Sequence, residues 1–278
     1  MTIDVIVPSV RPATIDRLLY SFRWNSIWPD LITLVSNEID SDIHVHGLPV
    51  RLIRFRSSVY PVGNRDVALR RNIGIWQSPC SHIVTFDDDQ LASIHLVEYA
   101  RALLRAKPFF WGHYRYLDFS QYGLEEIFQL PAEAGRPRES PPNAWHLWMS
   151  AYGGLFGAEA AYVRDRGGFD LIYCGRHGGE DQDLGRRLAA HAGDGECIFV
   201  HEPPFAWHPE HTPPWSAPQY SNLCEVGHAL RPADVYGHAV RQCTLCPYFE
   251  ADFDHLTGPE VVWPFDPACV EMVIEEPR

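Results

Sequence analysis

The first two hundred residues alternate between strand-like and helix-like segments, and this alternation constrains the fold more than any other feature. Apolar runs bounded by polar or turn residues predict strands at 3–7, 31–35, 52–55, 82–86 and 109–116. Apolar residues spaced three or four apart predict helices at about 12–24, 69–76 and 96–103. A repeated βα order is typical of an α/β domain.

Two proline-rich stretches mark changes in organisation. Residues 130–142 are rich in Pro, Glu, Arg and Gly and lack an apolar period, which predicts a surface loop. Residues 203–218 contain six prolines and make a poor core. We therefore predict a main domain over 1–212 and a small C-terminal appendage over 213–278.

Composition narrows the class of protein. Of the 278 residues, 46% are hydrophobic and 21% are charged, which is typical of a soluble globular protein. The formal net charge of -13 disfavours general attraction to nucleic acid or to an anionic membrane surface. Because no apolar run has the length of a membrane-spanning helix, we expect no stable membrane insertion and a cytoplasmic protein.

Three consecutive carboxylates, Asp87, Asp88 and Asp89, follow the strand predicted at 82–86. Adjacent anions repel one another, and a divalent cation that prefers oxygen ligands would compensate them. In extended backbone, Asp87 and Asp89 would share one face and Asp88 would point the opposite way. For the triplet alone, a solvated acidic turn is the alternative.

A second acidic motif follows two glycines, in Gly178-Gly179-Glu180-Asp181. Leu184 and Leu188 supply an apolar i, i+4 contact, so Glu180 and Asp181 are expected in the first turn of a helix, where the helix dipole favours ionised carboxylates. Such a carboxylate suits a general base, and for this motif alone acidic capping of the helix is the alternative.

Together these motifs resemble the glycosyltransferases of family 2, which have the GT-A fold. The resemblance covers residues 1–212 and rests on segments in the family's order, namely Val5-Ile6-Val7-Pro8-Ser9, Arg71-Asn72-Ile73-Gly74, Asp87-Asp88-Asp89, Gly168-Phe169-Asp170 and Gly179 to Leu184. It implies a three-layer, Rossmann-like domain with a mixed, mostly parallel central sheet. It also implies sugar transfer from a nucleotide-diphosphate donor, with Mn2+ or Mg2+ on the diphosphate.

The resemblance also implies roles for particular residues. Asp181 is expected to be the general base of an inverting transfer, and Glu180 to orient the acceptor or the helix start. Asp89, assisted by Asp87, is expected to hold the metal. Residues expected to contact the donor are Pro8, Ser9, Arg11, Glu38, Arg71, Asp87 and Asp88. Residues expected on the acceptor side are Trp148, Gly153, Gly154 and Asp170.

Two histidines follow the α/β region in Trp207-His208-Pro209-Glu210-His211. Imidazole is a common metal ligand, and some similar enzymes complete their metal site with a histidine in this place, so His208 and then His211 are candidates. A surface turn bounded by prolines is the alternative. The chain departs from many family members after the second strand, where Ser36-Asn37-Glu38 replaces paired aspartates.

The appendage contains a possible zinc-binding set, formed by Cys224, His228, Cys243 and Cys246. Three thiolates and one imidazole suit tetrahedral structural zinc, while unconnected buried thiols are the alternative. The acceptor is unidentified and open among a glycan, a lipid carrier, a protein and a small molecule. Two other functions remain open: a nucleotidyltransferase-like enzyme, and a non-catalytic binding module on the same fold.

Overall fold

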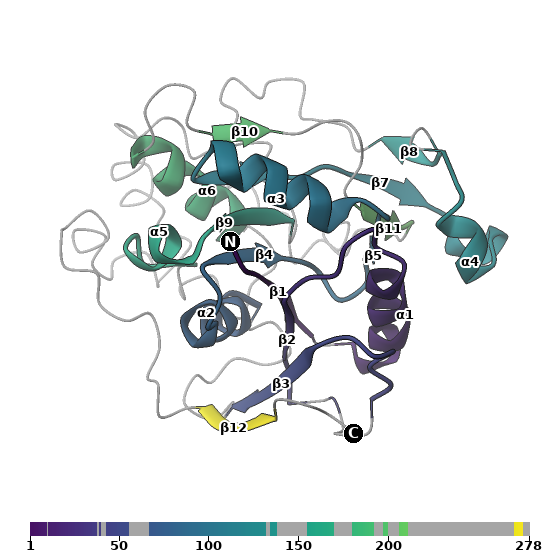
Figure 1. The fold of residues 1–278 in the computed structure, drawn as a ribbon, viewed down its shortest axis with the longest axis horizontal. Coiled ribbons are helices and arrows are strands. Elements are labelled where there is room, and N and C mark those ends of the chain that lie inside the picture. Colours follow the sequence, from purple (N-terminus) through teal and green to yellow (C-terminus); the bar gives the residue numbers. More distant parts are fainter. Residues whose placement is uncertain are drawn as a thin grey trace, which may run out of the picture.

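The computed structural model describes residues 1–9, 11–37, 39, 43–55, 67–131, 134–137, 155–169, 180–191, 197–199, 206–210 and 270–274. Its centre is an eight-stranded sheet in the order β10-β6-β9-β4-β1-β2-β3-β12 (Figure 1). These strands are β1 (Ile3–Pro8), β2 (Leu31–Val35), β3 (Val50–Phe55), β4 (His82–Thr85), β6 (Phe109–Trp111), β9 (Phe156–Glu159), β10 (Cys197–Phe199) and β12 (Val270–Ile274). Among these described strands, only β9 and β12 run antiparallel to their neighbours, so the sheet is mixed and mostly parallel.

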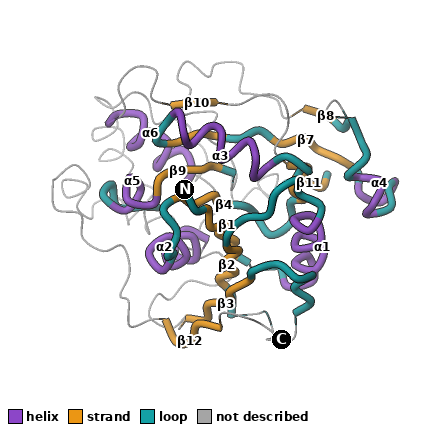
Figure 2. The backbone as a smooth tube through the Cα atoms, in the orientation of Figure 1, coloured by secondary structure: helices purple, strands orange, loops and turns teal. Residues whose placement is uncertain are grey.

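Helices cover both faces of this sheet, as Figure 2 shows. The residues of β1 that point to one face pack with α1 (Pro12–Arg23) and α3 (Leu96–Ala106). On the other face, Ile6 of β1 packs with α2 (Val67–Gln77), α5 (Ala160–Arg164) and α6 (Glu180–His191). The three-layer α/β architecture expected from the sequence is therefore confirmed.

The predicted helices form where apolar spacing and end signals agree. Pro12 opens α1, where its missing N–H costs nothing, and the buried positions Ile15, Leu18, Leu19 and Phe22 follow one helical stripe. In α6, Leu184 and Leu188 are buried one turn apart, as their spacing predicts. No helix in the described part of the chain is long and apolar enough to cross a membrane.

The aromatic strand predicted over 109–116 is in fact two strands in different sheets. β6 joins the large sheet, whereas β7 (Tyr114–Leu117) belongs to a four-stranded sheet in the order β5-β11-β7-β8. The other members are β5 (Leu91–Ala92), β11 (Ala206–Pro209) and β8 (Arg136–Pro137), and a 3-10 helix (Phe119–Gln121) and α4 (Leu124–Ile127) follow β7. The break at residues 112–113 occurs because β6 pairs with β9 while β7 pairs with β11.

The last described strand also belongs to the large sheet. β12 pairs antiparallel with β3, with Val273 opposite Ile53 and a register shift between Val270 and Met272. The sequence had not predicted this strand. The boundary near 212 stays a prediction, because most of residues 213–278 lies outside the described part.

Candidate functional site

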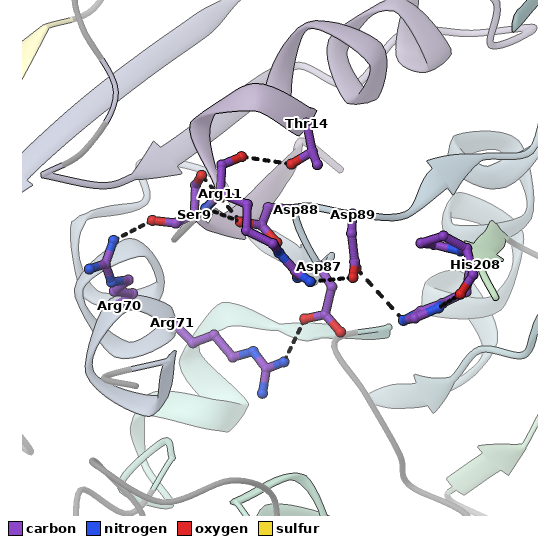
Figure 3. A network of polar contacts seen from close by, with 10 residues as sticks. Ser9, Arg11, Thr14, Arg70, Arg71, Asp87, Asp88, Asp89 and His208 are labelled. Atoms are coloured by element: carbon purple, nitrogen blue, oxygen red, sulfur yellow. Dashed lines mark hydrogen bonds and ion pairs between the residues drawn. The ribbon is translucent and has the colours of Figure 1, made fainter. Parts of the chain in front are cut away.

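The aspartate triplet lies in a turn at the carboxyl end of β4. The Phe86 amide donates to Ile6 O at 3.0 Å, and the Gln90 amide donates to Asp87 O at 3.3 Å. In this turn the side chains do not alternate as they would in an extended strand. The predicted grouping of Asp87 with Asp89, opposite Asp88, therefore does not match the observed ion pairs. Instead, Asp88 and Asp89 share one partner and Asp87 has another (Figure 3).

The partner of Asp88 and Asp89 is Arg11, the residue that precedes α1. The backbone N–H and the Nε of Arg11 each donate to Asp88 at 2.8 Å, and Arg11 Nη1 lies 2.5 Å from Asp89 Oδ2. Burial by itself lowers the pKa of the guanidinium, but Asp89 and Asp88 raise it above its usual value. Asp88 is 1% exposed and anchors the turn to α1, whereas the Arg11 side chain remains 46% exposed.

His208 faces Asp89 from the small sheet. β5, which starts two residues after Asp89, pairs with β11, which carries His208. His208 Nε2 lies 3.7 Å from Asp89 Oδ1, and the imidazole stacks on Tyr114 with ring centroids 4.9 Å apart. The structure therefore places His208 beside Asp89, and its role as a metal ligand stays a prediction.

The other ring nitrogen of His208 determines what Nε2 can do. Nδ1 lies 2.8 Å from Pro209 O, and because a carbonyl only accepts hydrogen bonds, Nδ1 must carry a proton. In the neutral imidazole, Nε2 then carries the lone pair and points toward Asp89. A metal-binding histidine commonly donates its second N–H to a carbonyl or carboxylate in this way.

These residues fit a divalent cation. A separation of 3.7 Å is too long for a hydrogen bond, but both atoms can bind one ion placed between them. A carboxylate oxygen with an imidazole nitrogen suits Mn2+, and carboxylates also suit Mg2+. Asp89 and His208 would hold the ion, with Asp87 on the same turn.

A buried arginine joins Asp87 to the second acidic motif. Arg71, on α2, is 2% exposed; its Nη2 lies 2.8 Å from Asp87, and its Nη1 lies 2.6 Å from Asp181 and 3.2 Å from Glu180. Burial alone would lower the pKa of the guanidinium, but the three carboxylates raise it above its usual value. Arg71 is thus a permanent cation between the end of β4 and the start of α6.

Two further residues of the Arg71-Asn72-Ile73-Gly74 segment, Asn72 and Gly74, have structural contacts of their own. Asn72 donates through Nδ2 to Phe169 O at 2.7 Å and accepts from the Phe169 amide at 2.8 Å, so it holds the backbone at Phe169, in the segment that follows α5. Gly74 lies against Ile6, where a Cβ would approach the Ile6 side chain to 2.3 Å. Asn72 was absent from the predicted site residues, although its place beside Arg71 was a usable signal.

The remaining predictions divide into two groups. Pro8 and Ser9 lie buried at the end of β1, where Ser9 Oγ donates to Asp88 at 3.4 Å. Arg70, also on α2, donates to the Ser9 carbonyl (Figure 3). The predicted residues outside the described part are Glu38, Trp148, Gly153, Gly154, Asp170, His211, Cys224, His228, Cys243 and Cys246.

The sheet order, the helical layers and the acidic turn at the end of β4 define a GT-A fold, as the sequence resemblance predicted. Among solved structures, the chain is similar to S. aureus TarS 1-349 in complex with UDP-GlcNAc, with a TM-score of 0.57 and 14% identity over 87% of this chain and 70% of that one. For TarS 1-349 in complex with UDP, the TM-score is 0.54 at 15% identity, over 87% and 69% of the two chains.

A further TarS structure gives a TM-score of 0.53 at 12% identity, and the match covers 42% of that chain. No family model matches the chain, and no curated protein matches it in sequence. At these identities the likeness concerns the fold.

Proposed function

We propose that this protein is a metal-dependent glycosyltransferase that takes its sugar from a nucleotide-diphosphate donor. The observation that carries the proposal is the convergence of Asp89 and His208, 3.7 Å apart, at the carboxyl end of β4 in a GT-A fold. Ligands of open α/β sheets bind at the carboxyl ends of the strands. The place of Asp89 and His208 in the fold and their ability to bind a metal therefore both support metal-dependent glycosyl transfer.

A bound Mn2+ or Mg2+ would neutralise the charge that develops on the leaving diphosphate. Asp89 and His208 would hold that ion, with Asp87 beside them. Because TarS binds UDP-GlcNAc in its structure, we propose UDP-GlcNAc as the first donor to test.

Asp181 is the proposed general base. Its side chain is 14% exposed, so one carboxylate can meet both an acceptor on the solvent side and the buried Arg71. The acceptor hydroxyl gives its proton to Asp181 and its oxygen bonds to the anomeric carbon, while the bond from that carbon to the diphosphate breaks and its electron pair leaves with the diphosphate. Attack opposite the leaving group would invert the anomeric configuration.

Arg71 is the proposed positioning residue for this base. Its guanidinium contacts Asp181 and Glu180 at the start of α6 and also Asp87 on the turn. Because one buried cation contacts both the proposed base and Asp87, it fixes their relative positions, as the geometry of catalysis requires.

The proposal can be tested without knowing the acceptor. A panel of nucleotide sugars is screened by thermal shift with Mn2+, and release of nucleoside diphosphate from each stabilising donor is then measured. We expect stabilisation and slow donor hydrolysis with UDP-GlcNAc or another sugar nucleotide, and loss of hydrolysis in Asp181→Asn. Asp165→Asn, an exposed carboxylate outside the site, is the matched control. No response to any sugar nucleotide would refute the proposal.

A further inference from the structure

Two histidines and an aspartate meet on the surface, on elements distinct from those that carry Asp89 and His208. Asp16 lies on α1, and His44 and His46 lie in the connection between β2 and β3. His46 Nε2 is 3.0 Å from Asp16 Oδ1, and His44 Nδ1 is 3.9 Å from the same oxygen. The two imidazole centroids are 4.0 Å apart, so the three side chains converge on one point.

His46 is held in an unusual backbone conformation. The Leu48 amide donates to Val45 O at 2.9 Å, and the two residues inside this turn, His46 and Gly47, have φ of 53° and 75°. Positive φ at both central positions is the mark of a type I′ turn, in which Asn and Gly are favoured. A histidine in this place bears a conformational cost that a local function can explain.

The imidazole of His46 is also packed in place. Its side chain is 11% exposed, and the Tyr20 ring contacts it edge-on with centroids 5.2 Å apart. His44 and Asp16 are 75% and 65% exposed, so an ion can reach the cluster from solvent. The site is therefore fixed on one side and open on the other.

We propose that Asp16, His44 and His46 bind a zinc-class divalent ion that links α1 to the β2–β3 connection. Two imidazole nitrogens and one carboxylate oxygen suit Zn2+, with water as the fourth ligand. At metal–ligand distances of about 2.0–2.2 Å, tetrahedral ligand atoms lie about 3.3–3.6 Å apart. The separations of 3.0 and 3.9 Å bracket that value, so small rotations of exposed side chains complete the site.

Zinc binding requires the proton on His46 Nε2 to leave that nitrogen. Because the Asp16 carboxylate only accepts, the His46 Nε2 that contacts it carries a proton. When Nε2 binds the ion, a neutral imidazole moves this proton to Nδ1, whereas an imidazolium releases one proton to solvent. Because an imidazolium cannot bind the ion, zinc binding weakens as the pH falls. The alternative is that Asp16 and His46 form only an ion pair, in which case this site would bind no zinc.

The test uses the full chain without a histidine tag, stripped of metal and titrated with ZnCl2 by calorimetry. His46→Asn keeps a residue that tolerates positive φ and removes the imidazole, so the turn is retained. We expect this variant, and His44→Gln, to bind one equivalent fewer than wild type, or to bind that equivalent at least about tenfold more weakly. Zinc should also raise the melting temperature of wild type more than that of either variant.

His95→Asn is the matched control. His95 lies 3.0 Å from the carboxylate of Glu98 on the surface, and this pair lacks the second imidazole of the proposed zinc site. Substituting His95 should therefore leave the zinc stoichiometry unchanged. Differences in stoichiometry separate this site from zinc bound at Asp89 and His208 or at cysteines. Wild-type stoichiometry and affinity in both His44→Gln and His46→Asn would overturn the proposal. Since His44 is 75% exposed, the test remains decisive even if His46→Asn fails to fold.

Discussion

Arg71 Nη1 lies 2.6 Å from Asp181 Oδ1, although the two residues are 110 positions apart in the chain. The same guanidinium donates through Nη2 to Asp87 at 2.8 Å. One buried cation therefore joins the turn proposed to bind the metal to the helix that begins with the proposed base. Both halves of the site depend on this residue.

Replacing Arg71 should destabilise the protein. Arg71→Met leaves three clustered carboxylates without their counter-charge, and removing one partner of a buried ion pair costs about 3–5 kcal/mol. Arg71→Lys restores the charge but not the planar fork that reaches both acidic motifs, so it should recover part of that stability and little activity. Urea unfolding measures the first effect. Arg105→Met, on the exposed side of α3, should change stability by less than about 0.5 kcal/mol.

Metal dependence should be traced to His208. Chelation with EDTA should abolish donor hydrolysis, and Mn2+ should restore it. In His208→Gln, the Mn2+ concentration for half-maximal activity should rise at least about tenfold. Mutating residues that only hydrogen-bond to a metal ligand already weakens metal affinity by about 10–100-fold, and loss of the ligand itself should cost at least as much. Unchanged Mn2+ dependence in this variant would show that His208 is not a ligand.

Gly168 should tolerate no side chain. Its φ is +62°, and a Cβ would approach Asn72 Oδ1 and Trp76 Cζ3 to 2.5 Å. Gly168→Ala should combine the cost of a left-handed conformation, about 1–2 kcal/mol, with an overpacking cost of about 1–3 kcal/mol.

Gly47→Ala separates these two costs. Gly47 has φ of +75°, and a Cβ at this position would meet no atom within 4 Å, so the conformational cost alone applies. Chemical denaturation of the two variants should therefore place Gly168→Ala at least about 1 kcal/mol below Gly47→Ala. Equal stability would mean that the contacts with α2 relax freely.

Asp4 should make stability depend on pH. Its carboxyl group is buried in β1, accepts from Thr33 Oγ1 at 2.9 Å and lies 3.7 Å from Arg51 Nη2. Burial raises its pKa from 3.8 to about 6, despite the opposing effects of hydrogen bonds and Arg51. A carboxyl group whose pKa is higher in the folded state binds its proton more tightly there, so its stabilisation is complete below pH 3.8 and is lost as the pH rises through about 6.

Asp4→Asn removes this titration. Between pH 4 and 7, the stability of wild type relative to the variant should fall by about 2 kcal/mol. Chemical denaturation at several pH values measures this difference. A difference that stays constant over the range would contradict the assignment.

Much of the fold was predictable because periodicity is local. The spacing of Leu18, Leu19 and Phe22 predicts α1 from neighbouring residues, and Pro12 and Thr14 are its start signals. The split of residues 109–116 was not predictable in this way. β6 and β7 are each defined by their pairing partners, β9 and β11, which lie more than 40 residues further along the chain.

The candidate site shows the same division. The acidic motifs, through their resemblance to family 2 glycosyltransferases, implied that Asp89, Asp181 and His208 belong to one site. They did not predict which charges meet. Arg11 and Arg71 were expected at the donor, yet in the structure Arg11 pairs with Asp88 and Asp89, and Arg71 pairs with both acidic motifs.

The sequence by itself determined the βα order, the approximate positions of the helices and the chemical types of the site residues, because each depends on neighbours within a few turns of chain. Only the tertiary structure decided that Arg71 would be the shared partner of Asp87 and Asp181, and that His208 would face Asp89. The physical reason is that ion pairing depends on distance in space. The fold sets that distance, bringing the turn after β4 together with the middle of α2, the start of α6 and β11.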